Sequence, residues 1–523
     1  MSKANPKPGE MPVKGKMLSS QANARIFESF PFNDYEISEP AFSEDEKQLF
    51  SALLAFVQRK TTFSRESKAI SKQLPAQFFG DLSQTLLRDI DIEGLSRRIP
   101  TEQEAASLQA MLEIALSGIE FAKNREGIAR NVLDKSIGFG PLSEMMRDPT
   151  LEEIMINSED KVFVFHKDFG MCKANTAFSN REEFLDLISR IANTVGRKFD
   201  SYNTFLDARL PDGSRANATY PTITPVSPTL TIRKFSQIPL SIIDLISNRT
   251  MNSELAAFLW AMVEGMRIEP MNLIVAGGTG CGKTTTLNAL STFIRANERI
   301  ITIEDTLELD LGSRENWVQM ESRPKTRDEI DVTMDDLLKN SLRMRPDRII
   351  VGEVRGPEAH TMFISMDIGH RGTMGTVHAN TARELLIRLQ SEPMSVPDSL
   401  LPLLDLILIQ NKVYSKDRGV VRHVSQLAEV GRMEGKALLG TIFEWKAGRE
   451  NVERTDVPSR VLDTLSEKAG ITKKELMQEI KIRQKVLEWM QKENIHSNPD
   501  VEKTIQDYYF KPESVLQKVS DGL

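Results

Sequence analysis

The chain has 523 residues and a formal net charge of −7, with 40% apolar and 27% charged residues. Its length exceeds one ordinary hydrophobic core and predicts roughly two to four domains, and its composition is typical of globular proteins. The acidic balance disfavours a nucleic-acid binder that depends on overall positive charge. The two cysteines, Cys172 and Cys281, form no CxxC pair. We therefore expect neither a disulfide framework nor a structural zinc site, and a reducing cytoplasm is the natural compartment.

No stretch of the sequence predicts a signal peptide or a membrane span. The first forty residues hold five prolines among polar residues and lack an apolar core segment. The apolar run at 399–410 contains Pro402 and Asp405 and is shorter than the roughly 20 residues that cross a bilayer. These features leave open whether the chain docks on a membrane surface.

The residue composition and the spacing of apolar residues change several times along the chain, which predicts an α/β protein with several regions. The expected regions, in chain order, are a disordered lead-in (1–40), a helical N-terminal domain (41–124), a mixed α/β domain (125–245), an α/β domain with a parallel sheet (250–435), and a C-terminal hairpin with helices (436–523).

Apolar residues at helical spacing predict three helices in the N-terminal region. The first follows a possible N-cap at Ser43, and the others lie near 74–90 and 101–121. In the mixed domain, EEIMINSEDKVFVFHKDFG predicts two strands joined by a turn at 158–161, followed by a helix at 181–194.

From about residue 250, short β-branched runs alternate with helical segments. The candidate strands are NLIVAGG, RIITIED, RIIVGEV and GTMGTVHA. Strands that alternate with helices imply a parallel sheet covered on both faces. Near the C-terminus, ALLGTIFEW is interpreted as a short hairpin, and helices rich in lysine and glutamate follow it.

A phosphate-binding loop is predicted at 277–284, GGTGCGKT, which matches GxxxxGK[ST]. Glycines let successive N–H groups turn inward around phosphate oxygens, and the helix that starts there adds its positive end. Lys283 can reach the β- and γ-phosphates, and the Thr284 hydroxyl can ligate Mg²⁺. The preceding NLIVA and the following TTTLNALSTFI fit the strand and helix that this motif requires, which disfavours a chance match. The candidate nucleotide-binding residues here are Gly277, Gly278, Thr279, Gly280, Cys281, Gly282, Lys283, Thr284 and Thr285.

Two acidic clusters follow predicted strands, at the sheet edge where ligands bind in open α/β folds. The first, ITIEDTLEL, contains Glu304, Asp305 and Glu308, and the second, RPDRIIVGEVRG, contains Glu353. Many P-loop ATPases have a metal-binding aspartate where this chain has Gly352, so the metal-side carboxylate is expected from the first cluster. Glu353 is the candidate that positions the attacking water.

Two histidines lie in the segment GHRGTMGTVHANT, at positions 370 and 378. A zinc site is disfavoured because no cysteine or close carboxylate completes a ligand set. His378 ends a predicted strand after the Glu353 strand, where a polar side chain can sense a γ-phosphate. A hydrogen-bonded structural histidine is the alternative.

These elements in this order resemble the secretion ATPase superfamily, which includes the motors of type II and type IV secretion, type IV pili and the archaellum. The resemblance covers about residues 125–430 and includes DARLPDGSRANA and TIRKF upstream of the loop. In the type II secretion and pilus-extension branch the catalytic segment reads GExRD, whereas this chain has Gly356 at the aspartate position. That branch's CxxC metal module is also missing. The chain therefore looks closer to the type IV secretion, tight-adherence and archaeal branches.

The resemblance implies a homohexameric ATPase with a RecA-like domain, a smaller N-terminal α/β domain, and ATP and Mg²⁺ bound between the two. It assigns phosphate and magnesium to Lys283 and Thr284, water activation to Glu353, assistance of the metal to Glu304 and Glu308, γ-phosphate sensing to His378, and contacts from the N-terminal domain to Arg209, Arg215 and Arg233. LPDGSR is also a plain turn sequence, so a solvated turn is the alternative for Arg209 and Arg215.

The expected activity is ATP hydrolysis that drives movement between the two domains. The movement would act on a polytopic membrane platform protein, from a cytoplasmic chain peripheral to the membrane, to move filament subunits or secreted substrates. The helical region before residue 125 is the expected contact with the platform or with a regulatory subunit. A nucleic-acid translocase is one alternative, although no basic run with interleaved aromatics supports it and no nucleic acid is expected. A nucleotide-binding regulator without turnover is the other.

Overall fold

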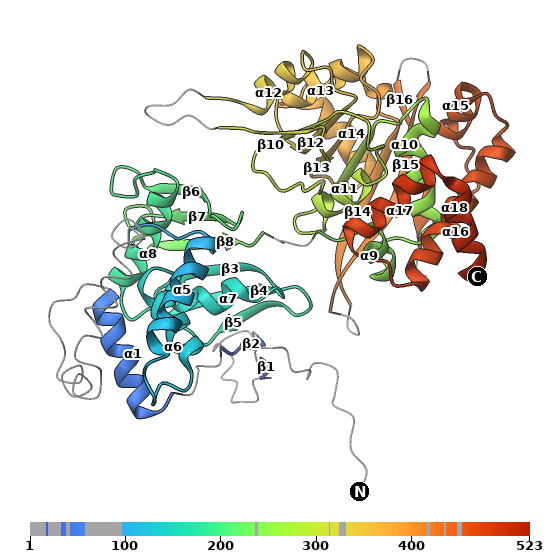
Figure 1. The fold of residues 1–523 in the computed structure, drawn as a ribbon. Helices are drawn as coiled ribbons and strands as arrows, with labels where there is room; N and C mark the ends of the chain where they lie inside the picture. The colour runs from blue at the N-terminus through green and yellow to red at the C-terminus, as the bar shows by residue number, and fades with distance from the viewer. Residues whose placement is uncertain are drawn as a thin grey trace, which may run out of the picture. The chain divides into compact units, whose positions relative to one another are not determined.

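The computed structural model describes residues 17–18, 33–37, 42–57, 97–235, 239–312, 314–323, 331–415, 419–433, 436–446 and 452–522. The chain forms two compact units, and each is described by itself (Figure 1). The first comprises Met1–Ser236 with Lys416–Gly419, and the second comprises Gln237–Ser415 with Val420–Leu523. Most of the predicted lead-in at 1–40 and the predicted helix near 74–90 lie outside the described residues.

The first unit begins with a small helical cluster. Its helices are α1 (Glu44–Val57), α5 (Glu102–Leu116) and α6 (Arg125–Ser136), and they share a core of buried leucine, isoleucine and valine side chains. The predicted cap at Ser43 is confirmed, since its hydroxyl accepts a hydrogen bond from the Glu46 N–H at 3.3 Å. The Glu46 carboxylate also accepts the N–H groups of Lys123 and Asn124, which ties α1 to the start of α6.

Within the described residues, the first unit contains an eight-stranded sheet in the order β1-β2-β5-β4-β3-β8-β7-β6. The predicted turn at 158–161 is confirmed, because β3 and β4 pair in antiparallel fashion across it. Helix α8 (Arg181–Thr194) has the predicted bounds and buries its apolar side in the sheet core. The strands are β1 Met17–Leu18, β2 Asn33–Tyr35, β3 Leu151–Ser158, β4 Lys161–His166, β5 Gly170–Ala174, β6 Phe205–Arg209, β7 Arg215–Thr219 and β8 Thr229–Arg233, with η1 Gly140–Leu142 and α7 Ser143–Arg147 directly before β3.

The second unit is built on a sheet that has nine strands in the part of the chain the structure describes. Their order is β11-β10-β12-β13-β9-β14-β15-β16-β17, and the pairs among β11, β10, β12, β13, β9 and β14 are parallel. The four predicted strands are confirmed as β9, β10, β12 and β13. The strands are β9 Leu273–Gly277, β10 Ile300–Glu304, β11 Trp317–Glu321, β12 Arg348–Val354, β13 Met374–Val377, β14 Leu406–Ser415, β15 Gly419–Met433, β16 Lys436–Trp445 and β17 Val452–Arg454.

The interpretation of ALLGTIFEW as a hairpin is wrong. The whole stretch lies in one strand, β16, which pairs in antiparallel fashion with β15 on one side and β17 on the other. Alternating apolar and small residues do not show where a chain reverses, so the two neighbouring strands had to be seen in the fold.

Helices cover both faces of this sheet, as the alternation of elements predicts (Figure 1). Neighbouring side chains on β9 point to opposite faces: Leu273 and Val275 pack into one core, and Ile274 and Ala276 pack into the other. The helices are α9 Ile242–Ser247, α10 Ser253–Glu264, η2 Gly265–Arg267, α11 Lys283–Ser291, α12 Met334–Ser341, α13 Glu358–Asp367, α14 Ala382–Gln390, η3 Leu401–Leu403, α15 Arg460–Ala469, α16 Lys473–Lys492, α17 Asn498–Phe510 and α18 Pro512–Gly522.

The apolar run at 399–410 forms a short 3₁₀ turn and then enters the central strand β14. Among the described helices, none is long and apolar enough to cross a membrane.

Candidate functional site

The phosphate loop connects the central strand β9 to helix α11. Gly280 (φ +68°) and Gly282 (φ +93°) adopt the left-handed backbone that favours glycine, and this turns the loop back toward the helix. Gly277 is required for a different reason. A Cβ at that position would lie 2.1 Å from the carbonyl oxygen of Gln410 and 2.5 Å from Cys281 Sγ. The loop is therefore pressed against the neighbouring strand β14 at its first residue.

Lys283 and Thr284 lie in the first turn of α11, where the helix presents its positive end. The Lys283 ammonium donates hydrogen bonds to the carbonyl oxygens of Gly277 (3.2 Å) and Gly278 (3.0 Å), so it curls over the loop. Thr284 and Thr285 are half-buried beside it. Burial raises the pKa of the Cys281 thiol, so this side chain acts as a small apolar filler within the loop.

Residues from β14 and β15 also line the loop, and the sequence did not point to them. Arg422 donates a hydrogen bond from Nε to the Gly280 carbonyl at 2.9 Å. The Gln410 side chain accepts a hydrogen bond from the Thr286 hydroxyl at 2.7 Å. Both lie more than a hundred residues after the loop in the chain. The pairing of β14 with β9 brings Gln410 to the site, and the place of β15 beside β14 brings Arg422.

His378 follows β13, the strand between β9 and β12, and so lies at the edge where the loop begins. Its Nε2 is 3.4 Å from the Thr279 hydroxyl, and its Nδ1 is 3.3 Å from the Arg388 guanidinium. Arg388 also donates to the His378 carbonyl, which fixes the ring from α14. His370 lies at the other end of β13, so the two histidines are not brought together.

Glu304 ends β10 and is 1% exposed. One carboxylate oxygen accepts the N–H groups of Glu308 (2.7 Å) and Leu309 (2.9 Å), which orients the side chain. A Cβ on Gly352 of the adjacent strand β12 would lie 2.9 Å from Glu304 Cγ. Glu304 therefore fills the space that a side chain at position 352 would need. Glu308 is half-buried and contributes its backbone to this arrangement.

Glu353 is partly exposed on β12 and lies beside an arginine that joins the two acidic clusters. Arg355 Nη2 is 3.4 Å from a Glu353 carboxylate oxygen and 3.0 Å from an Asp305 carboxylate oxygen. These groups line a cavity of about 350 Å³ that also includes Thr333 and Glu358. A negatively charged base next to an open, water-accessible cavity can orient a water molecule.

Glu358 shapes the turn that carries Arg355. One of its carboxylate oxygens accepts the N–H groups of Arg355 and Gly356, both at 2.7 Å. A Cβ on Gly356 would lie 2.7 Å from the other oxygen. An aspartate at 356 would therefore displace Glu358, which is a physical reason for the glycine at this position.

The three predicted arginines of the first unit form a row across neighbouring strands. Arg209 on β6 pairs in register with Arg215 on β7, and Arg215 pairs in register with Arg233 on β8. Directly opposite residues share one face of a sheet, so the three guanidinium groups lie on the side away from the buried core. The phosphate loop belongs to the second unit, and the arginine row belongs to the first.

The loop fits a nucleotide's phosphates on its own geometry. Two glycines hold the backbone in left-handed turns, and a Cβ on Gly278 would meet only the Asn380 side chain, at 3.4 Å. Backbone N–H groups at a helix start and a lysine suit a polyphosphate, and a neighbouring threonine hydroxyl suits Mg²⁺.

A family model described as "Type II/IV secretion system protein" matches residues 135–494, which include both acidic clusters, the loop and the histidine segment. The chain belongs to this family. The predicted α/β fold class is confirmed by the parallel sheet with helices on both faces. The predicted enzyme class, a P-loop ATP hydrolase, is confirmed at the level of the family.

Similarity to individual proteins extends over parts of the chain. The protein MJ0781 of Methanocaldococcus jannaschii is 52% identical over 239 residues, which is 45% of this chain and 33% of the relative's own length. The conjugal transfer protein TrbB of Rhizobium radiobacter is 32% identical over 262 residues, 49% of this chain and 76% of TrbB. Among solved structures, the VirB11 ATPase of the Brucella suis type IV secretion system has 26% identity and a TM-score of 0.28, covering 55% of this chain and 94% of that one.

Proposed function

We propose that this chain hydrolyses ATP and uses the hydrolysis to drive a secretion, conjugation or pilus-type machine at a membrane. The observation that carries the proposal is the shared sheet edge: the phosphate loop, His378, Glu304 and Glu353 all lie at the carboxyl ends of the parallel strands β9, β13, β10 and β12, respectively.

In this proposal the loop and Lys283 hold the phosphates, and Thr284 with Glu304 holds Mg²⁺. The bound metal ion would supply positive charge that offsets the charge developing on the transferred phosphoryl group. Glu353 orients the attacking water and accepts its proton, and His378 senses the γ-phosphate through its position beside Thr279. Glu308 supports Glu304 through its backbone N–H.

The arginine row of the first unit is proposed to supply the other half of the site. The three arginines lie in register on one sheet face, and a guanidinium stabilises phosphoryl charge well. Their arrival at the phosphates would make hydrolysis depend on movement between units. A homohexameric ring would provide the required partner surfaces.

The partners are also part of the proposal. TrbB is named for conjugal transfer and VirB11 for type IV secretion, which supports a membrane-bound machine as the target. We propose a polytopic platform protein as the direct partner, a possible regulatory subunit, and a cytoplasmic, membrane-peripheral location. Archaellum, pilus, secretion and conjugation machines all remain within this proposal.

The test is the substitution Glu353→Gln in the full chain. We expect the rate of ATP hydrolysis to fall by about 10²- to 10⁴-fold, because the general base is lost, while binding of a fluorescent ATP analogue is retained. Glu493→Gln at the exposed end of α16 is the matched control and should hydrolyse ATP like the wild type.

Unchanged hydrolysis in the Glu353→Gln variant would reject the catalytic assignment. Wild-type protein that binds nucleotide but shows no hydrolysis, even when assembled, would favour a regulator instead. Stimulation by DNA that declines steeply with salt would favour a nucleic-acid translocase.

A further inference from the structure

The helix that carries Lys283 runs on into a turn, where the C-cap residue Thr292 donates its N–H to the carbonyls of Ala289 and Leu290. Helix α11 has nine residues, so it is about 13 Å long and behaves as a short rod. No glycine follows Ser291, and the chain continues in tight turns through Ile294. These turns satisfy the carbonyls of the last residues of α11, and the next three carbonyls, of Thr292, Phe293 and Ile294, accept donors from elsewhere.

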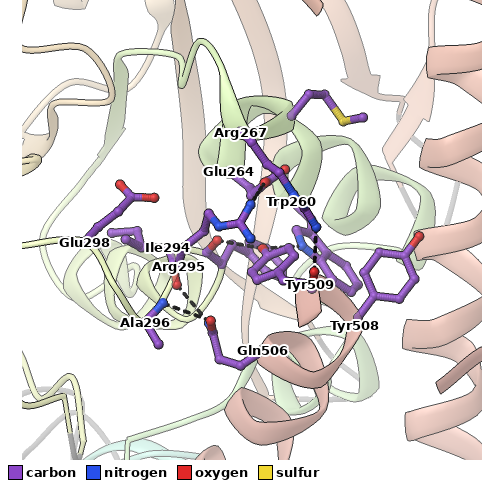
Figure 2. A network of polar contacts seen from close by, with 12 residues as sticks. Trp260, Glu264, Arg267, Ile294, Arg295, Ala296, Glu298, Gln506, Tyr508 and Tyr509 are labelled. Carbon is purple, nitrogen blue, oxygen red and sulfur yellow. Dashed lines mark hydrogen bonds and ion pairs between the residues drawn. The ribbon is translucent and has the colours of Figure 1, made fainter. Parts of the chain in front are cut away.

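Those donors come from α17, near the C-terminus of the chain (Figure 2). Gln506 donates from Nε2 to the carbonyl oxygens of Ile294 (2.9 Å) and Thr292 (3.4 Å), and its own oxygen accepts the Ala296 N–H at 2.9 Å. Tyr509 donates its hydroxyl proton to the Phe293 carbonyl at 2.7 Å. Two side chains of α17 thus satisfy three consecutive carbonyls after the phosphate-loop helix.

A third group reaches the same turn with help from α17. The Arg314 guanidinium donates to the carbonyl oxygens of Ile294 (2.7 Å) and Arg295 (3.1 Å). Its Nε is 2.9 Å from a Glu502 carboxylate oxygen, and the arginine side chain is only 5% exposed. Positive charge at the carboxyl end of a helix is stabilising because it interacts favourably with the negative end of the helix dipole.

Helix α17 is itself held firmly against the core. Tyr509 is 3% exposed, and its hydroxyl accepts a hydrogen bond from Trp260 Nε1 at 2.6 Å. The Trp260 ring stacks on Phe293, with ring centroids 5.3 Å apart. The end of α11 therefore rests between α10 and α17, and it cannot shift without breaking these contacts.

From this geometry we infer that α17 caps the phosphate-loop helix, and that Gln506 and Tyr509 are positioning residues for Lys283 and the loop. The inference rests on the proposed nucleotide site. Helix α17 lies beyond the family match at 135–494, so the cap comes from a part of the chain outside the shared core.

Helix α11 can transmit the effect of α17 to the phosphate loop because a short helix is rigid. The carboxyl end is fixed by donors from α17, and the amino end carries the N–H groups and Lys283 that face the phosphates. When the cap is lost, the helix tilts or frays, and the loop is no longer held in its binding geometry. Ground-state and transition-state contacts to the phosphates weaken together, so the expected signature is a change in KM with little change in kcat.

The test is Gln506→Met in the full chain, which keeps the side chain's length but removes both hydrogen-bonding groups. We expect the KM for ATP and the dissociation constant of a fluorescent ADP analogue to rise by about three- to tenfold, with kcat nearly unchanged. Gln478→Met on the exposed side of α16 is the matched control and should leave both values at wild type.

Charge variants separate positioning from general packing. Gln506→Lys still donates to the carbonyls and suits the helix dipole, so nucleotide affinity should be restored, whereas Gln506→Glu should be weaker than Gln506→Met. A Gln506→Met protein that melts earlier but binds the ADP analogue like Gln478→Met would overturn the inference. Because ADP binding needs no turnover, this outcome is distinguishable from a failure of the proposed hydrolysis.

Discussion

In the nine-stranded sheet, the charged residues at the carboxyl ends of the parallel strands (the carboxyl edge) differ in exposure from those at the amino ends (the amino edge). At the carboxyl edge, the side chains of Arg355, Asp305 and Glu353 are 57%, 40% and 39% exposed. At the amino edge, Asp405 before β14 is 7% exposed, and it accepts hydrogen bonds from Arg371 (2.7 Å) and from the Asn272 N–H (2.9 Å).

Burial explains why one edge is fixed and the other can change. The Asn272 side chain accepts the Thr373 N–H and donates to the Leu403 carbonyl, so the starts of β9, β13 and β14 form one buried network. Breaking a buried ion pair leaves a charge in a poor solvent, whereas an exposed pair can be exchanged for water. The amino edge thus holds the sheet together, and the carboxyl edge keeps its charges available for a ligand.

The largest expected difference between the edges is in stability. Asp405→Ala should lower the free energy of unfolding by about 3–5 kcal/mol, because the buried Asn272 N–H and the Arg371 guanidinium both lose an acceptor. Asp305→Ala at the opposite edge should cost less than about 1 kcal/mol. Denaturant melts of both variants measure the two losses of unfolding free energy. Equal losses would contradict the difference in stability between the two edges.

Within the loop, stability and nucleotide binding should depend far more on Gly277 than on Gly278. Gly277→Ala places a Cβ against the Gln410 backbone and should cost about 3 kcal/mol, with loss of nucleotide binding. Gly278→Ala meets only the Asn380 side chain and should remain close to wild type in both properties. Melting curves and binding of a fluorescent nucleotide test the pair, and a tolerated Gly277→Ala would contradict the close contact with β14.

Gly352→Asp restores the aspartate that many P-loop ATPases have at this position. Here it should reduce ATP hydrolysis by about tenfold, since the new carboxylate competes with Glu304 for one space and adds like charge. The double variant Gly352→Asp with Glu304→Ala should recover part of the rate in steady-state assays. If the single variant is fully active, Glu304 does not occupy the place of the missing acid.

The smallest expected effect is at Arg355. Arg355→Gln should lower kcat by about two- to fivefold, because an exposed ion pair contributes roughly 0–1 kcal/mol to holding Glu353 in place. Arg355→Lys retains the positive charge, so its kcat should fall less than that of Arg355→Gln. A change of more than a hundredfold in kcat would instead mean that Arg355 contacts the nucleotide directly.

Much of the second unit's fold was predictable because its signals are local. The strands β9, β10, β12 and β13 are continuous buried runs, and each is followed by a turn or polar segment. Strand β11 is only half-buried, so it carries no clear apolar pattern. The run that enters β14 was recognised as apolar, but its role as the strand beside the phosphate loop depends on long-range pairing.

By itself, the sequence determined the phosphate loop, the order of the acidic and histidine segments, and the family, because each depends on residues adjacent in the chain. Only the tertiary structure decided that Glu304 fills the space beside Gly352, that the three arginines align across β6, β7 and β8, and that α17 caps α11. Strand register and helix packing set these contacts. Both depend on how distant segments share one buried core, and no local spacing of residues records that.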